Sequence, residues 1–203
     1  FSHGLKEYGN AVAVWADIPL ARGGESGGVS KKRAPEAKWI ASEANRILCE
    51  RPDFSVGVIS FYSEQVTELH RQMARLRMTE EKEDGSYQIA EDWRTTRDSS
   101  GALKERLRIG TVDSFQGKEF DVVLLSVTRS NSLQASDEKA RRRKFGHLML
   151  ANRLCVAMSR QKRLLIAAGD SGMLRSDGAT EAIGALCKFY ELCGGPHGRI
   201  VQA

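Results

Sequence analysis

Short apolar segments that alternate with helical patterns constrain the fold of this chain more than any other feature of its sequence. Five such segments are five to seven residues long, which suits buried strands: 11–15, 56–60, 107–112, 121–127 and 163–168. Apolar residues recur at helical spacing in four other segments, at about 35–49, 65–77, 150–160 and 181–192. Strands that are apolar on both faces and separated by helices indicate a parallel sheet covered by helices. The sequence therefore predicts an α/β fold whose ligands bind at the carboxyl ends of the strands.

Two polar segments interrupt this alternation. Residues 78–105 are rich in charge, glycine, serine and threonine, which predicts a surface insertion that is partly mobile. Residues 130–146 are predicted to form a polar loop that carries a basic run, Lys139 and residues 141–144. This run is either a solvated face or a clamp on the backbone of a nucleic acid.

The composition fits one domain with a basic surface. The chain has 203 residues and a formal net charge of +5, which suits a nucleic-acid or phosphate ligand, although a basic surface can also serve solubility alone. Its four cysteines lack the spacing of a metal site, so we expect buried free thiols, no metal and a reducing cytoplasmic or nuclear location. No apolar run is long enough to cross a membrane. Because the chain opens at Phe1, we expect it to be part of a longer protein.

The segment from Gly110 to Lys118 differs from a phosphate-binding P-loop. That loop needs roughly four residues between its first glycine and a Gly-Lys pair, and then serine or threonine. Here six residues separate Gly110 from Gly117, and Glu119 follows the lysine. We therefore expect that the chain cannot hold a triphosphate by itself.

The same segment has the groups needed to line a cleft. Gly117 would let the backbone approach a ligand, Gln116 can donate and accept hydrogen bonds, and Glu119 can accept from ribose hydroxyls or position a water. The side chains that could reach a sugar-phosphate backbone are those of Thr111, Asp113 and Ser114. The alternative is a polar turn that only joins two strands.

Two arginines in the segment 150–160 suggest contact with phosphate. Arg153 and Arg160 are seven positions apart and would share one helix face, roughly 10 Å apart along the axis. One phosphoryl group cannot take both, so we expect Arg160 to be the arginine finger and Arg153 to orient the cleft or pair with Glu119. The alternative is a pair of solvent-exposed salt-bridge arginines.

Aromatic and imidazole side chains give weaker signals. Tyr62 follows the predicted strand at 56–60 and could stack on a base, or it could be a half-buried packing residue. For His147 and His197 we predict no partners and assign no role.

Three segments resemble motifs of superfamily 1 helicases in the right order. Residues 58–65 are similar to motif IV, residues 111–121 to motif V, and residues 153–160 to motif VI. The detail resembles the up-frameshift, senataxin and Dna-two-like branch, over about residues 11–170. The resemblance implies that residues 1–203 form the second, C-terminal RecA-like domain, which has the P-loop NTPase fold without its own P-loop.

The resemblance also implies roles for individual residues. Gln116, Gly117, Glu119 and Arg153 would border the nucleotide, and Arg160 would be the finger on its γ-phosphate. The side chains implied to face single-stranded DNA or RNA are those of Ser60, Tyr62, Thr111, Asp113, Ser114, Arg129 and Ser130. ATP and Mg²⁺ would be bound mainly by the N-terminal RecA-like domain, which this sequence lacks and which would be the chain's main protein partner.

Besides lacking the first RecA-like domain, the sequence departs from the family at four points. The arginine motif that usually precedes this region is absent. Cys155 stands where asparagine is usual, Gln161 stands where alanine is common, and the insertion at 78–105 is longer than expected. The resulting prediction is the C-terminal motor domain of an ATP-dependent helicase that is inactive in isolation. The alternatives are a non-catalytic nucleic-acid-binding module and a nucleotide-metabolising doubly wound domain.

Overall fold

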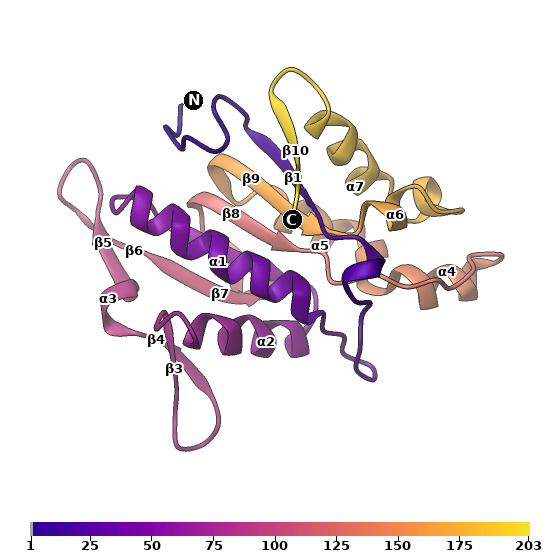
Figure 1. Cartoon of the computed structure of the whole chain (residues 1–203), viewed down its shortest axis with the longest axis horizontal. Coiled ribbons are helices and arrows are strands. Elements are labelled where there is room, and N and C mark those ends of the chain that lie inside the picture. Colours follow the sequence, from indigo (N-terminus) through magenta and orange to yellow (C-terminus); the bar gives the residue numbers. More distant parts are fainter. Residues whose placement is uncertain (1) are drawn as a thin grey trace.

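A six-stranded parallel sheet forms the centre of the molecule in the computed structural model, which describes residues 2–203 (Figure 1). The strand order is β10-β1-β9-β8-β2-β7, and every neighbouring pair is parallel. The strands are β1 (Ala13–Asp17), β2 (Val56–Ser60), β7 (Leu107–Thr111), β8 (Phe120–Ser126), β9 (Gln161–Gly169) and β10 (Gly198–Gln202). This sheet confirms the predicted α/β class.

Helices cover both faces of the sheet and enclose two separate apolar layers. Helices α1 (Ala34–Glu50) and α2 (Ser63–Ala74) lie over one face, where they pack against Val122 and Leu124 of β8. On the other face Val123 and Leu125 join the second layer, with the helices α4 (Glu138–Phe145), α5 (Ala151–Ala157), α6 (Ser171–Leu174) and α7 (Ala179–Cys193) and the 3-10 turn η3 (Gly146–Met149). Alternate residues of each central strand point into opposite apolar layers, which explains why these strands are apolar throughout.

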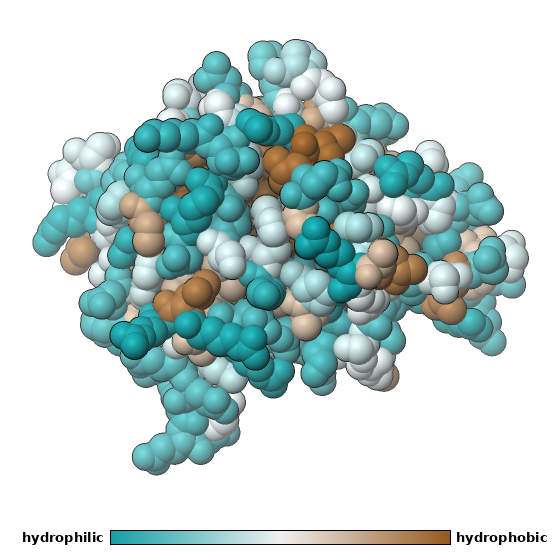
Figure 2. Space-filling model, in the orientation of Figure 1, coloured by the Kyte–Doolittle hydropathy of each residue, from teal (hydrophilic) through white to brown (hydrophobic). Residues whose placement is uncertain are grey.

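The segment 78–105 is more regular than its composition predicted. It forms two hairpins around one helical turn: β3 (Thr79–Glu81) with β4 (Tyr87–Ile89), α3 (Glu91–Arg94), and β5 (Thr95–Arg97) with β6 (Leu103–Glu105). The β3–β4 hairpin projects from the body of the molecule (Figure 1), and hydrophilic residues cover it and most of the face in view (Figure 2).

A buried carboxylate ties the second hairpin to the sheet. Lys104 of β6 lies 2.5 Å from Asp121 of β8, which also accepts hydrogen bonds from Ser55 and Arg163. Burial alone would raise the pKa of Asp121, but the hydrogen bonds from Lys104 and Ser55 hold it below its ordinary value. The carboxylate therefore stays ionised and anchors the insertion.

Two predictions about secondary structure were wrong, and one strand was missed. The basic run lies largely on α4 rather than in a loop, and Asp137 caps this helix by accepting from the backbone N–H of Ala140 at 2.7 Å. The edge strand β10 was missed. The helix predicted at 150–160 ends at Ala157, because the chain turns there to enter β9.

The cysteines also differ from expectation. All four are free, but Cys49 and Cys155 are exposed, whereas only Cys193 is fully buried. Among residues 2–203 there is no helix with the length and apolar character needed to cross a membrane.

Candidate functional site

An exposed polar turn follows β7 at the carboxyl end of the sheet. The 3-10 turn η2 (Val112–Phe115) leads into residues 116–119, all four of which are exposed. Gly117 has a φ of +72°, a conformation that favours glycine, and a Cβ added there would meet nothing within 4 Å. The turn therefore presents open backbone to a ligand, together with the side chains of Gln116 and Glu119.

Aromatic packing fixes this turn to the sheet. Phe115 and Phe120 flank it, are fully or almost fully buried, and have ring centroids 5.5 Å apart. Both rings pack against Gly57 of β2, where an added Cβ would lie only 2.8 Å from each of them. Ser114 tightens the turn by donating its hydroxyl to the carbonyl of Thr111 at 2.7 Å.

Arg160 lies beside this turn. Its carbonyl accepts a hydrogen bond from the backbone N–H of Phe120 at 2.9 Å, which joins the end of the turn to the start of β9. Its guanidinium donates to Ser159 Oγ at 2.9 Å, and the buried Nε has no acceptor. Within residues 2–203 no carboxylate pairs with Arg160, so this half-buried cation is available to an anionic ligand.

Arg153 has a partner, although not the one that was predicted. It lies on α5 and binds both carboxylate oxygens of Asp113 on η2, so it does not pair with Glu119. Arg153 and Arg160 were predicted to share one helix face. They do not, because α5 ends at Ala157. The Arg153–Asp113 pair fixes α5 against the exposed turn, since a two-oxygen pair has a defined geometry.

The residues implied to face a nucleic acid fall into two groups. Asp113 and Ser114 are exposed, and Thr111 is half-buried. The other four are buried, with at most 4% of each residue exposed: Ser60, Tyr62, Arg129 and Ser130. That they face a strand stays a prediction. Polar side chains near strand ends can form hydrogen bonds with residues of distant loops instead of facing solvent, and these four do so.

The partners of the buried group come from loops far apart in the sequence. Arg129 pairs with Glu25 at 3.0 Å, and Ser130 donates to Asp170 at 2.7 Å. Tyr62 accepts a hydrogen bond from the backbone N–H of His147 at 3.0 Å, and the two rings stack with centroids 4.8 Å apart. The prediction that His147 has no partner was therefore wrong, because Tyr62 is its partner.

A buried carboxylate holds the turn after β8. Glu36 on α1 accepts from the hydroxyl of Ser126 at 2.5 Å and from the backbone N–H of Thr128 at 2.8 Å, and lies 3.4 Å from Arg33. Thr128 has a φ of +70°, which is unusual for a residue with a branched side chain. Burial raises the pKa of Glu36 to about 7 against the opposing effect of Arg33 and of the two hydrogen bonds.

Sequence reasoning missed Glu36 and Arg33. Both side chains are completely buried, although an acidic residue in the first turn of a helix usually interacts with the helix N-terminus at the surface. Gln65 extends the network by accepting from the backbone N–H of Arg33 at 2.7 Å and donating to Ser126 at 2.9 Å. No local pattern encodes contacts between residues this far apart.

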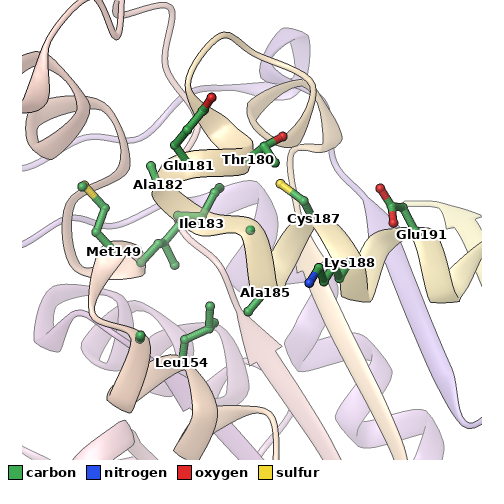
Figure 3. Close-up of a pocket in the computed structure, with 13 residues that line it drawn as sticks. Met149, Leu154, Thr180, Glu181, Ala182, Ile183, Ala185, Cys187, Lys188 and Glu191 are labelled. Atoms are coloured by element: carbon green, nitrogen blue, oxygen red, sulfur yellow. The ribbon is translucent and has the colours of Figure 1, made fainter.

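A cavity of about 550 Å³ lies on the other side of α5 (Figure 3). Met149, Leu154 and residues of α7 from Thr180 to Glu191 line it, and α7 is kinked at Ile183. None of the predicted site residues lines this cavity. We therefore place the candidate site at the exposed turn and Arg160 instead.

The chain matches one protein-family model, AAA_12, described as an AAA domain, over residues 5–172. Similar proteins include human NFX1-type zinc finger-containing protein 1, with 40% identity over 68 residues, 34% of this chain and 3% of that protein. DNA polymerase alpha-associated DNA helicase A of Saccharomyces cerevisiae is 33% identical over 128 residues, 63% of this chain and 14% of that protein. Human RNA helicase Mov10l1 is 35% identical over 83 residues, 41% of this chain and 6% of that protein.

Among solved structures, the C-terminal domain of a possible DNA helicase from Lactobacillus plantarum WCFS1 aligns with a TM-score of 0.44 at 13% identity, and the alignment covers 86% of each chain. The chain thus spans between 3% and 14% of the length of these three curated relatives.

Proposed function

Because this chain belongs to the AAA_12 family of AAA domains, we propose that it is the C-terminal motor domain of an ATP-dependent nucleic-acid helicase. The observation that carries the proposal is the guanidinium of Arg160. It has no acidic partner among the described residues and lies beside an exposed polar turn to which its own backbone is hydrogen-bonded. Relatives whose names include DNA helicase and RNA helicase support the same function.

In this proposal the chain supplies half of an ATP site. Arg160 stabilises the negative charge that develops on the transferring phosphoryl group, and Gln116 orients the attacking water. Gly117 and Glu119 border the nucleotide, while Arg153 acts by fixing Asp113 and the turn.

ATP and Mg²⁺ would be held mainly by a separate N-terminal RecA-like domain, the proposed partner. The residues of this chain fit only part of that task. The sequence has no P-loop, and the described residues contain no cluster of three or more potential metal ligands among histidine, cysteine, aspartate and glutamate. In isolation, we expect the chain to be inactive as an ATPase.

Single-stranded DNA or RNA is the proposed substrate. The carboxyl ends of β2, β7 and β8 lie at one edge of the sheet, where Thr111, Asp113 and Ser114 are accessible or partly accessible. The net charge of +5 favours a polyanion.

The test is ATP turnover by the full-length protein with and without single-stranded DNA or RNA. Arg160→Ala should reduce turnover by roughly 10³–10⁵-fold and leave ATP binding within a few fold, because an arginine finger acts on the transition state. Arg175→Ala is the matched control, since Arg175 is exposed at the C-cap of α6 and, within residues 2–203, its side chain hydrogen-bonds only to Tyr190. Turnover near the wild-type level in Arg160→Ala would refute the finger assignment. Strand binding without any turnover would favour a non-catalytic binding module.

A further inference from the structure

A second cavity, of about 450 Å³, lies at the carboxyl edge of the sheet, away from the exposed turn. The loop before α1, the end of β2, the turn after β8 and the helix α4 enclose it. The side chains that matter for its chemistry are those of Lys31, Tyr62, Arg129, Arg142, Arg143 and His147. It is large enough for a small ligand or part of a polymer.

The charge of this cavity is positive. Its one carboxylate, Glu25, is neutralised by Arg129 at 3.0 Å and accepts two further hydrogen bonds, from Ser130 and Asn131. Arg142 pairs with Glu138 at an exposed site, where ion pairs are weak. Arg143 is exposed and has no ion pair within residues 2–203. In the same part of the chain the ammonium of Lys31 has no ion pair and donates one hydrogen bond, to the carbonyl of Gly27. Uncompensated cations therefore face this space.

An aromatic surface is built into the same cavity. The imidazole of His147 lies parallel to the ring of Tyr62, with an interplanar angle of 4°, and is held further by the carbonyl of Phe61 at 3.2 Å from Nδ1. Tyr62 is only 2% exposed, whereas His147 is half-buried. The tyrosine thus supports the imidazole from one side, and the imidazole is the ring that a ligand can reach.

The backbone is shaped to permit this arrangement. Gly146 has a φ of +54°, and a Cβ there would overlap Tyr62 Oη and lie 2.9 Å from Arg129 Nη1. In addition, the buried Nε of Arg129 has no hydrogen-bond partner among the described residues. A larger residue at position 146 would separate the rings from the arginine, so the site depends on glycine.

We propose that this cavity binds one nucleotide of a single strand, with its base stacked on His147 and the neighbouring phosphates on Arg142, Arg143 and Lys31. An aromatic ring next to arginines is the usual chemistry of single-strand binding, because every base has a π-face and every nucleotide has a phosphate. The proposal rests on the proposed function and deepens it. It moves the stacking role from Tyr62 to His147 and gives α4 the task of contacting phosphates.

The test is equilibrium binding of the full-length protein to labelled single strands, DNA and RNA in parallel, each compared with a strand of abasic nucleotides of equal length. His147→Ala should weaken binding to a base-containing strand by about tenfold and binding to the abasic strand by less than about twofold. His147→Phe should keep near wild-type affinity because it keeps a stacking ring. His197→Ala is the control, since His197 lines a different cavity.

The phosphate contacts are tested separately, through the salt dependence of strand binding. Replacing Arg142 and Arg143 by glutamine should lower the slope of log affinity against log salt by about 0.7 for each lost contact, on both kinds of strand. Arg75→Gln, an exposed arginine on α2's C-cap, is the matched control and should leave the slope unchanged.

The outcomes are distinguishable. Suppose that the wild type binds strands but that His147→Ala binds them like His197→Ala, or loses as much affinity for the abasic strand as for the base-containing one. The proposed stacking site is then wrong, and the motor assignment stands. If the salt slope is unchanged in the double variant, the phosphate contacts are wrong. If the wild type binds neither DNA nor RNA, the proposed function fails as well.

Discussion

Replacing Glu36 by glutamine should change how the stability of this domain depends on pH. In the folded chain the carboxylate is fully buried, and burial raises its pKa from the ordinary value of 4.5 to about 7. The folded state therefore binds a proton more tightly than the unfolded state does. The stabilisation that this proton provides is complete below the ordinary pKa and is lost as the pH rises through about 7.

The magnitude follows from the displacement of the pKa. One pKa unit corresponds to about 1.4 kcal/mol, so between pH 5 and pH 8 the wild type should lose roughly 2–3 kcal/mol relative to Glu36→Gln, which has no proton to exchange. All other titrating groups are shared by the two proteins and cancel in this difference. The difference in unfolding free energy between wild type and variant should thus fall as the pH rises from 5 to about 7 and level off towards pH 8.

Urea denaturation of the domain at several pH values measures this difference, since the free energy of unfolding extrapolates linearly to water. Glu138→Gln is the control, because Glu138 lies on the surface in an exposed pair with Arg142. A difference between wild type and Glu36→Gln that stays constant from pH 5 to pH 8 would show that Glu36 is ionised throughout. The lowering of the Glu36 pKa by Arg33 would then be larger than its raising by burial, and the assignment of a raised pKa to Glu36 would be wrong.

Two further substitutions test the packing around the candidate site. Gly57→Ala should destabilise the domain by about 1–3 kcal/mol in the same denaturation assay, because a Cβ would overlap two buried phenylalanine rings. The control Gly184→Ala should be neutral or stabilising, because nothing lies within 4 Å of its added Cβ. Equal effects of the two substitutions on stability would refute the packing argument. Arg153→Ala should cost at most about 1 kcal/mol, and a double-mutant cycle with Asp113→Ala should give a coupling of about 0.5 kcal/mol, since the pair is partly exposed. A coupling near zero would mean that the pair does not hold α5 to the turn.

The central strands could be predicted from the sequence because their apolar runs are continuous. The strand at Val56–Ser60 was predicted with the bounds that it has in the structure, and β7 and β8 within one residue at each end. The edge strand β10 could not be found in this way, since only Ile200 and Val201 are strongly apolar and one side of the strand has no neighbour among the described residues. Helix α4 was missed because its long charged run carries little apolar periodicity.

The candidate site was only partly predictable. The exposed turn at 116–119 follows from local composition, because it consists of one glycine and three long polar or charged side chains that favour solvent. Burial of Ser60, Tyr62 and Arg129 depends instead on partners supplied from elsewhere in the chain, such as Thr128, His147 and Glu25. Pairings of this kind are set by the tertiary structure and leave no mark on the neighbouring sequence.

The attachment of the exposed turn to the sheet has a consequence for how the proposed motor would move. Phe115 and Phe120 fix both ends of the turn against Gly57, and the backbone of Phe120 is bonded to that of Arg160. The turn and the arginine are therefore expected to travel as one rigid body with the sheet. Sensing of a nucleotide would then occur by rotation of the whole domain toward its partner rather than by reshaping of a loop, with the hinge outside this segment.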